Sequence, residues 1–405
     1  VAYKPCEKGS ITSADESGLI FSGFLLFFDP PKLGVREVLA KMQNAKVAMK
    51  VITGDHALVA AHIAAEIGLL PARGAESMED YLKEHVLTGE KIHHMSNRAL
   101  IRKAQQMCIF AELEPHQKER IILALRKAGF VVGYLGDGIN DATALHAADV
   151  SISVDVAADV VREVADIVLL KKDLSVLLRG IQEGRKTFAN TMKYIFMATS
   201  ANFGNMFSMA GVSLLIPFLP LLPKQILFNN LLTDGPEMAI ATDRVDKQII
   251  EQPVKWDMKF IRRFMVVFGL VSSIFDFLTF GVLLYVFKAT PEVFRTAWFI
   301  ESVVSASTIV LVVRTRKPFW MSRPSKTLAL GVAGVVLFTF ISPWTPVAKL
   351  FGFVPLPAGI LCAIAAIVVL YVVSAEIAKR FFFYGANGVV KKGENHTNAA
   401  SPLKT

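Results

Sequence analysis

Residues 136–141 form the hexapeptide Gly136-Asp137-Gly138-Ile139-Asn140-Asp141, which directly follows an apolar run at 130–135. The apolar run predicts a buried strand, and the two glycines allow the turn after it to bend tightly. Two carboxylates and one amide therefore gather at the end of a strand. Mg²⁺ prefers oxygen ligands and is often bound beside phosphate, so the sequence predicts a site for magnesium and a phosphoryl group.

Strands and helices alternate along residues 29–188. This order predicts an α/β fold of the Rossmann type, with a parallel sheet and helices on both faces. We expect helices at about 33–45, 57–67 and 114–128, a polar insertion at 71–97, and strands at about 46–52, 108–111, 130–135, 149–153 and 166–169.

A second polar motif, Thr53-Gly54-Asp55, follows the strand expected at 46–52. Ligands of parallel sheets bind at the carboxyl ends of the strands, so this motif and the hexapeptide are expected at the same edge of the sheet. Asp55 has two interpretations. It contacts phosphate or Mg²⁺, or it caps the helix that starts near residue 57.

Composition divides the chain into two halves. Residues 1–188 are mixed and charged, whereas residues 189–383 are dominated by long apolar stretches, which predicts a cytosolic domain followed by a polytopic membrane domain. Much of the formal net charge of +9 lies in loops between apolar stretches, so no nucleic-acid partner is expected. The three cysteines have neither redox nor metal-ligand spacing.

Six segments reach the roughly 20 residues needed to cross a bilayer. We expect them at about 189–214, 222–242, 262–287, 295–313, 327–345 and 357–381. The loops 243–263 and 314–326 carry six and five Lys and Arg residues, against four in the three alternate loops together. The positive-inside rule places the first two loops in the cytoplasm, together with the N-terminal domain and a polar tail.

Polar side chains inside the expected spans are candidates for ion binding, because burying them in lipid is costly. Asn202 and Asn205 share a helix face in the first span. In the second span, Asn230, Thr233 and Asp234 lie within one turn.

Two further features of the spans bear on ion binding. Gly235-Pro236 is expected to unwind the second span locally and to free carbonyl groups for a cation. Asp276 and Glu301 are acids in later spans, and two interpretations remain open for them: polar contacts between helices or cation binding.

Four motifs, in this order, resemble the C-terminal part of P-type ATPases: Asp29-Pro30-Pro31-Lys32, Thr53-Gly54-Asp55, Pro115 with Lys118, and the hexapeptide 136–141. The resemblance implies a phosphorylation domain with a haloacid-dehalogenase-like fold. It also implies that Asp29 and Pro30 lie in the hinge that returns the chain from the nucleotide domain, and they are the expected cofactor-binding positions for ATP.

The resemblance assigns roles to the residues of these motifs. Asp137 is expected to bind the catalytic Mg²⁺, with Asp141 supporting that site. A hydroxyl, a cation and an amide are expected to contact the transferred phosphoryl group, because they stabilise an anionic, metaphosphate-like transition state. The expected catalytic set is Thr53, Gly54, Asp55, Lys118 and Asn140.

Other motifs of the family do not occur in this sequence, including the phosphorylated aspartate of its Asp-Lys-Thr-Gly-Thr motif and the actuator domain's Thr-Gly-Glu-Ser loop. We therefore expect ATP turnover only together with the N-terminal part of the same pump. The resemblance implies the end of the nucleotide domain at 1–28, the phosphorylation domain at 29–188, the last six spans at 189–383 and a disordered cytoplasmic tail at 384–405.

The candidate ion site resembles that of cation pumps in this family. Asn202, Asn230, Thr233 and Asp234 match ligands of the calcium pumps, whereas Asn205 stands where those pumps have a glutamate. With one acid fewer, a pair of Ca²⁺ ions is not expected. A site with few acids and several amides suits a partly hydrated Mg²⁺, which sheds its water reluctantly.

Longer segments resemble the bacterial magnesium-transporting P-type ATPases, among them 197–209, 217–225, 231–246 and 298–302. That resemblance implies ATP-driven movement of Mg²⁺ into the cytoplasm across the plasma (inner) membrane. The expected ligands of the transported cation are Asn202, Asn205, Asn230, Thr233, Asp234 and Glu301. The alternatives are a pump for Ca²⁺ or H⁺, and a membrane-tethered phosphatase or non-catalytic half-pump.

Overall fold

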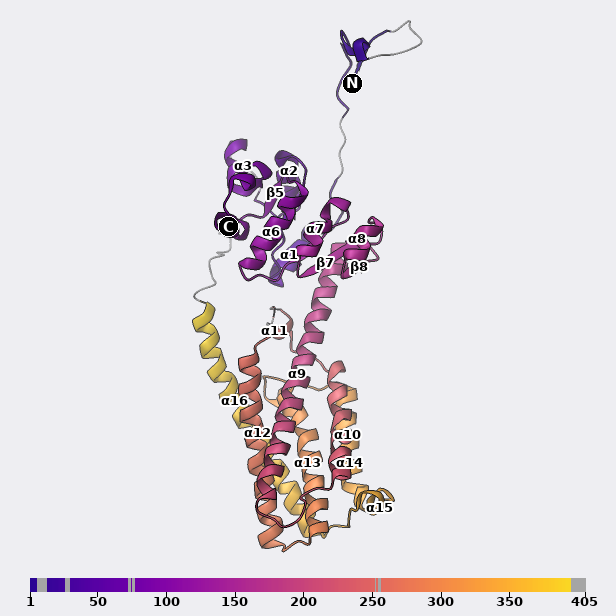
Figure 1. Ribbon diagram of the computed structural model, residues 1–405, viewed down its shortest axis with the longest axis vertical. Helices are drawn as coiled ribbons and strands as arrows, with labels where there is room; N and C mark the ends of the chain where they lie inside the picture. Colours follow the sequence, from indigo (N-terminus) through magenta and orange to yellow (C-terminus); the bar gives the residue numbers. More distant parts are fainter. Residues whose placement is uncertain are drawn as a thin grey trace. The chain divides into compact units, whose positions relative to one another are not determined.

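The chain divides into two compact units. The computed structural model describes residues 1–5, 13–25, 30–71, 74, 77–251, 253 and 256–394 (Figure 1). Unit 1 comprises Val1–Gln43 with Ala48–Leu174, and unit 2 comprises Asn44–Val47 with Ser175–Thr405. The division falls at 174/175, so the domain boundary expected at 188/189 lies inside the first long helix of unit 2.

Unit 1 contains two parallel three-stranded sheets, with the strand orders β3-β5-β4 and β6-β7-β8. A short antiparallel pair, β1 (Ala2–Tyr3) with β2 (Ile20–Phe21), is exposed. The parallel α/β arrangement expected from the sequence is confirmed. The parallel strands are β3 (Val51–Ile52), β4 (Val86–Thr88), β5 (Ile109–Ala111), β6 (Gly133–Leu135), β7 (Val150–Val154) and β8 (Ile167–Leu169).

The helices of unit 1 pack against these strands. In α2, four buried alanines allow a close approach to Ile109 and Ala111 of β5, and α7 contacts β6 and β7. The helices are α1 (Val35–Asn44), α2 (Ala57–Glu66), α3 (Met78–His85), α4 (Gly89–His94), α5 (Asn97–Gln106), α6 (Pro115–Lys127), α7 (Ala142–Ala147) and α8 (Asp159–Val164), with the 3₁₀ turns η1 (Ser13–Glu16) and η2 (Ile139–Asp141).

The start of α6 fixes the position of Lys118. Pro115 occupies the first helical position, where its fixed φ is already helical. The backbone N–H of Glu114 donates to Gln117 Oε1 at 3.1 Å, which closes the first turn. Ile121, Ile122 and Leu125 anchor the helix in the core.

The structure divides the expected parallel sheet into two parts. The family resemblance implies an incomplete domain whose sheet lacks the strand that carries the nucleophile. Within the described ranges, β3 pairs only with β5 and β6 only with β7, so each of these strands has one unpaired edge. Leu135 lies in β6 and is 41% exposed, and Val131, two residues before the strand, is 74% exposed. Strands of parallel sheets are normally buried on both faces. The sheet is split because no described strand pairs with both β3 and β6.

The polar insertion expected at 71–97 is also a wrong prediction. The segment contains α3, β4 and α4, and Val86 and Leu87 of β4 are 1% and 3% exposed. A strand of three residues is too short to show a periodic pattern among polar neighbours, and for that reason it was missed.

Unit 2 is helical. Its long helices are α9 (Leu174–Ser213), α10 (Pro223–Ala239), α12 (Met258–Gly281, followed by a π-helical turn at Val282–Val286), α13 (Pro291–Val313), α14 (Lys326–Ile341) and α16 (Ala358–Glu394). Its short elements are η3 (Ile240–Thr242), α11 (Lys247–Ile250), η5 (Phe319–Met321), η6 (Ser342–Trp344) and α15 (Val347–Phe351).

Four helices of the described part are long and apolar enough to cross a bilayer, namely Met258–Val286, Pro291–Val313, Lys326–Trp344 and Ala358–Phe383. The other two expected spans coincide with α9 and α10. The α10 helix has 17 residues, and α9 has 40 residues but is less apolar. Both carry candidate cation ligands, whose polar side chains lower the hydropathy. The count of six spans therefore stays a prediction.

Two local predictions for unit 2 differ from the structure. The α10 helix continues through Gly235 and Pro236, so the expected unwinding there is wrong. Helix packing allows a proline inside a spanning helix, and a helix satisfies the remaining backbone groups. The α16 helix is described to Glu394, past residue 384 where the tail was expected, because adding a residue to an existing helix is easy.

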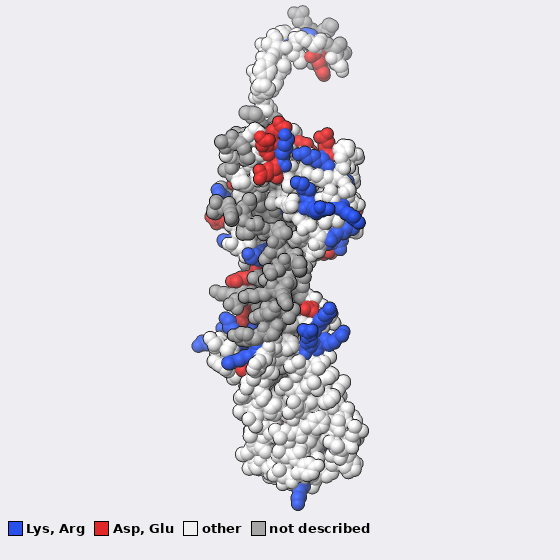
Figure 2. All heavy atoms as spheres, turned by 90° about the vertical axis from the view of Figure 1, so that its left-hand side faces the viewer, with Lys and Arg blue, Asp and Glu red and all other residues white. Residues whose placement is uncertain are grey.

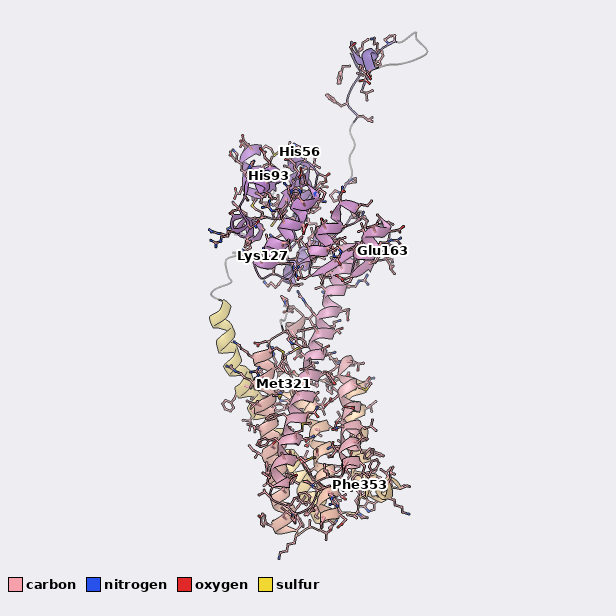
Figure 3. All side chains as sticks on the ribbon, in the orientation of Figure 1. His56, His93, Lys127, Glu163, Met321 and Phe353 are labelled. Atoms are coloured by element: carbon pink, nitrogen blue, oxygen red, sulfur yellow. The ribbon has the colours of Figure 1, made fainter. Side chains whose placement is uncertain are left out.

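Aromatic side chains pack one end of unit 2. Phe228 stacks on Phe351 with ring centroids 4.1 Å apart, and Phe299 contacts Phe353 at 4.4 Å. Figure 3 labels Phe353 near one end of this unit and Met321 toward the other.

A buried ionic cluster joins several elements of unit 2. The carboxylate of Asp243 is fully buried and accepts hydrogen bonds from Lys193 Nζ at 2.7 Å and Arg314 Nη1 at 3.1 Å. It also accepts from the backbone N–H of Ser325 at 3.0 Å. These contacts tie α9, the end of α13 and the start of α14 to the segment that follows α10.

Candidate functional site

Asp141 is the centre of the turn that follows β6. Its Oδ1 accepts hydrogen bonds from Lys118 Nζ and from the Tyr134 hydroxyl, both at 2.8 Å. Its Oδ2 accepts from the backbone N–H of Gly138 at 3.3 Å. Lys118 comes from the first turn of α6 and Tyr134 from β6, so one carboxylate joins the helix, the strand and the turn.

These contacts also set the charge of Asp141. Burial raises the pKa of the carboxyl, but hydrogen bonds from Lys118, Tyr134 and the Gly138 backbone outweigh burial and hold the pKa below its ordinary value of 3.8. Burial, with the neighbouring carboxylate, raises the pKa of Tyr134, which remains a neutral donor. Asp141 is therefore ionised at neutral pH and holds the Lys118 ammonium group in place.

Gly136 permits this arrangement. A Cβ atom at position 136 would lie 2.7 Å from the Cβ of Asp141, closer than two non-bonded carbon atoms pack. Any side chain at this position would push Asp141 away from Lys118.

Asp137 has a more open environment than Asp141. Its side chain is 53% exposed, and its Oδ2 accepts a hydrogen bond from Lys172 Nζ at 2.7 Å. Lys32 Nζ donates to the backbone carbonyl of Lys172 at 2.7 Å. The carboxylate of Asp137 thus has a cation beside it and remains accessible from solvent.

The donor set of this turn fits Mg²⁺. Magnesium beside phosphate is usually bound by one or two carboxylates, with phosphate and water oxygens completing the shell. Asp137 matches this pattern, since it supplies one carboxylate that is half exposed to solvent. No group of three or more His, Cys, Asp or Glu side chains with metal-binding geometry occurs in the described part of the chain, so other ligands would come from phosphate, water or further residues.

Thr53 and Asp55 form a pair of their own after β3. Thr53 Oγ1 donates to Asp55 Oδ2 at 2.7 Å and accepts from the Asp55 backbone N–H at 3.1 Å. The α2 helix is capped by His56, labelled in Figure 3, whose Nδ1 accepts from the N–H of Leu58 at 3.3 Å. The interpretation of Asp55 as the helix cap is therefore wrong, because the cap lies one residue later.

The remaining predicted residues of unit 1 are separate from these pairs. Asn140 is exposed in η2 with no side-chain hydrogen bond to a described residue, so its amide is available to a ligand. Gly54 and Pro30 are exposed, and Asp29 lies outside the described residues. No hydrogen bond or ion pair within the described ranges joins the Thr53–Asp55 pair to the turn after β6.

Three helices of unit 2 meet at Ser302 of α13. Its hydroxyl accepts from Asn229 Nδ2 of α10 at 2.9 Å and donates to Asn205 Oδ1 of α9 at 3.4 Å. Asn229 is 4% exposed, and its Oδ1 has no hydrogen-bond partner. A buried carbonyl oxygen without a donor is a natural ligand for a cation.

The other expected ligands on α9 and α10 lie on open faces. Asn202, Asn230 and Asp234 are exposed, and the Thr233 hydroxyl donates to the carbonyls of Asn229 and Asn230 of its own helix at 3.1 Å. Among the described residues, no hydrogen bond brings Asn202 and Asp234 together. These residues alone do not form a closed site.

Glu301 lies instead beside a second acid, Asp276 of α12. Asp276 Oδ2 accepts from the Ser208 hydroxyl at 2.6 Å, and its Oδ1 accepts from Trp298 Nε1 at 3.0 Å. The carboxyl groups of Asp276 and Glu301 are within hydrogen-bonding distance. Their residues are 2% and 1% exposed, and Glu301 Oε2 has no hydrogen-bond partner.

Sequence analysis missed several residues of these clusters. Tyr134 alternates with the exposed Gly133 and Leu135, so a period of two would have placed it on the inner face. Helix phase alone does not separate Asn229 from Asn230, since both lie one turn from Thr233. Lys172 carries no local signal, because only the fold brings it to Asp137.

Two family models match this chain. Residues 11–149 match the haloacid dehalogenase-like hydrolases, and residues 218–381 match the C-terminus of cation transporting ATPases. The first match contains the turn after β6, and the second contains α10 to α14 and most of α16. The class of protein is therefore a haloacid-dehalogenase-like domain joined to the helical domain of a cation-transporting ATPase.

Curated relatives agree with this class. The chain is 41% identical to the magnesium-transporting ATPase, P-type 1, of Escherichia coli K12 over 385 residues, which are 94% of this chain and 42% of that protein. It is 42% identical to the corresponding protein of Salmonella typhimurium LT2 over 390 residues, 94% of this chain and 41% of the relative. A calcium-transporting ATPase of Bacillus subtilis is 32% identical over 256 residues, 62% of this chain and 28% of the relative.

The chain belongs to the P-type ATPase family, and it is similar to the magnesium-transporting members. It spans less than half the length of these curated relatives.

Proposed function

We propose that this chain is part of an ATP-driven pump that moves Mg²⁺ across the plasma membrane into the cytoplasm through an aspartyl-phosphate intermediate. The Asp141 network carries the proposal, because it holds a lysine at the carboxyl end of a strand beside an accessible carboxylate, Asp137. The phosphorylated aspartate would belong to the N-terminal part of the pump, outside this sequence.

The residues of the turn suit phosphoryl transfer. Asp141 positions the Lys118 ammonium group, and the amide of Asn140 is free to donate. With the hydroxyl of Thr53, these groups offer hydrogen-bond donors to the equatorial oxygens of a transferred phosphoryl group, where charge accumulates. Mg²⁺ bound at Asp137 would neutralise part of the phosphate charge.

The unpaired edges of β3 and β6 support a further strand from the N-terminal part of the pump. Thr53 directly follows β3, and Asp137 follows β6 by one residue. A parallel strand that paired with both edges would end between these two motifs. An aspartate at the end of that strand would lie where the phosphoryl group has to be transferred.

The open faces of α9 and α10 support further helices around the cation. On α9, Met206 lies one turn after Asn202 and is 74% exposed. On α10, Leu231 and Met238 lie about one turn on either side of Asp234, and they are 66% and 75% exposed. An acid facing lipid at the bilayer centre costs about 2.5–3.5 kcal/mol. Helices from the rest of the pump would cover this face and complete the site around Asn202, Asn230, Thr233 and Asp234.

The charge distribution supports a cytoplasmic unit 1. Figure 2 shows Lys and Arg gathered at one end of the helical unit, and a long stretch beyond them with almost no charged side chains on the face drawn. Arg262, Arg263 and Arg316 are exposed in the loops that follow α10 and α13 or at the adjoining helix start. The positive-inside rule assigns these loops to the cytoplasm.

Reconstitution of the intact pump in proteoliposomes tests the proposal. With the ATP-binding side outside and Mg²⁺ in the lumen, addition of ATP should lower the lumenal Mg²⁺ concentration, read with a trapped Mg²⁺ indicator. Movement of Ca²⁺ or H⁺ in place of Mg²⁺ would contradict the proposed cargo. Absence of any ATP-driven cation movement would contradict the pump.

A further inference from the structure

The pair formed by Asp276 and Glu301 is unlike the other buried acids of unit 2. Asp243 is paired with Lys193 and Arg314, and Glu376 with Lys379. No ion pair of the described residues reaches Asp276 or Glu301, although they are 2% and 1% exposed.

Two carboxyl groups in contact need a cation or a proton between them, because adjacent like charges cannot both stay ionised. The donors that reach Asp276 are neutral, a hydroxyl and an indole N–H. Among the described residues, the buried phenol of Tyr371 also interacts electrostatically with both acids, and it brings no positive charge. The charge of the pair is thus not balanced by the part of the chain that is described.

Oxygen atoms that suit a hard cation surround the pair. Glu301 Oε2 is buried without a hydrogen-bond partner, and the Ser208 hydroxyl lies 2.6 Å from Asp276 Oδ2. Three helices contribute these groups: α9, α12 and α13. Two ionised carboxylates balance the double positive charge of a divalent cation, whereas the single carboxylate of Asp234 balances only half of it.

A small polar cavity lies between the same helices, and Ser305 in its lining is one helical turn from Glu301. Its volume is about 10 Å³, close to the minimum for one water molecule. Its polar lining comes from Ser200, Asn205, Ser272, Ser305 and Tyr371, and the Ser305 hydroxyl donates to the Ser302 carbonyl at 3.1 Å.

We infer that Asp276 and Glu301, with the hydroxyl of Ser208, form a binding site for a divalent cation inside the helical unit, separate from the open face around Asp234. The site takes a hard cation with oxygen ligands, and Asp276 is a ligand that the sequence alone left undecided. This inference rests on the proposed function, since it assigns a second binding site to the transported cation.

The test uses the intact pump in proteoliposomes and measures the Mg²⁺ concentration that gives half-maximal ATP-driven transport. Asp276→Asn keeps the shape of the side chain and removes one charge. We expect the half-maximal concentration to rise at least about tenfold, the scale of losing an important metal contact. Asp276→Glu should recover most of the affinity. Glu292→Gln, an exposed acid in the first turn of α13, is the matched control and should match the wild type.

If Asp276→Asn does not fold, a second variant tests the same site. Ser208→Ala removes a hydroxyl and leaves both acids, and it should raise the half-maximal Mg²⁺ concentration by a few-fold. Unchanged Mg²⁺ dependence in whichever of these variants folds would overturn the inference and leave the pair as a proton-sharing contact between helices. A wild-type pump that does not move Mg²⁺ would instead contradict the proposed function.

Discussion

The acids of unit 1 and those of the helical unit differ in what neutralises their charge. Asp141 lies 2.8 Å from Lys118 and Asp137 lies 2.7 Å from Lys172, so each has a cation of the same chain beside it. Asp276 and Glu301 contact each other and have no such cation among the described residues. A buried acid that is paired within its own chain positions other groups. Two buried acids without a basic partner need a proton or a cation from outside, whereas Asp137 is half exposed and remains accessible to Mg²⁺.

Asp243 sharpens this comparison, because it is buried in the helical unit and is nevertheless fully paired. Burial alone therefore does not distinguish a structural acid from a candidate ligand. Among the buried acids of this unit, the presence or absence of a basic partner does. The following variants test the roles assigned to the paired acids and to their partners.

The largest effect is expected from Asp243→Ala. The substitution leaves Lys193 and Arg314 buried without their carboxylate, which costs about 3–5 kcal/mol. The free energy of unfolding, measured in mixed detergent micelles, should fall by that amount, whereas the exposed Glu251→Ala should change little. A loss below about 1 kcal/mol would show that this cluster is not structural.

Asp137→Ala is expected to act on turnover more than on stability. Both side chains of its ion pair with Lys172 are about half exposed. Exposed ion pairs contribute at most about 1 kcal/mol to the free energy of unfolding. In the intact pump, loss of the accessible carboxylate should lower the ATPase rate by about 10²–10³-fold, as loss of one transition-state contact does. Asp159→Ala, another exposed acid of unit 1, is the control. Equal rates for both variants would remove Asp137 from the site.

Lys118→Met should destabilise unit 1 by about 2 kcal/mol, the scale of a partly buried hydrogen bond to a charged group. Lys127→Met, at an exposed position of the same helix (Figure 3), is the control. Hydrogen exchange of the α6 and β6 amides measures the local stability.

The Lys118 effect should depend on pH. The pKa of folded Asp141 lies below its ordinary value of 3.8, so its contribution to stability is fully present above that value and is lost as the pH falls through the lower folded-state pKa. The difference between wild type and Lys118→Met should therefore shrink in acid below pH 3.8. A difference that grows in acid would contradict the assigned charge of Asp141.

The smallest effect is expected from Lys172→Met. The pair that it removes is exposed, so the free energy of unfolding should change by less than about 1 kcal/mol. Chemical unfolding followed by the fluorescence of a probe on unit 1 measures this value. A larger loss would mean that the Lys172 side chain supports the turn itself.

Much of unit 1 was predictable from local pattern. The helices near 33–45, 57–67 and 114–128 and the five expected strands correspond to α1, α2, α6, β3, β5, β6, β7 and β8. The sequence predicted a parallel sheet that lacks one strand, but it did not show that β3 and β6 would be the two edges left unpaired. The short β4 was missed because three residues show no periodicity.

The sequence predicted which residues belong to the candidate site better than it predicted the contacts between them. The turn 136–141 and Lys118 were expected together, and Lys118 bonds to Asp141 as that grouping suggests. The role of Asp55 was decided only by the exact start of α2, and helix boundaries are local details that the sequence leaves uncertain by a residue or two. Asp276 and Glu301 stayed undecided because their contact depends on the packing of α12 against α13.

The most direct test of the account compares wild type with Asp234→Ala in the intact pump, reconstituted in proteoliposomes, and follows ATP-driven Mg²⁺ movement. The account predicts that the variant binds ATP and loses most of its Mg²⁺ transport, because the acid on the open face of α10 contacts the ion during transport. Transport at the wild-type rate would contradict the link between the carboxylate turn of unit 1 and a cation bound in the helical unit.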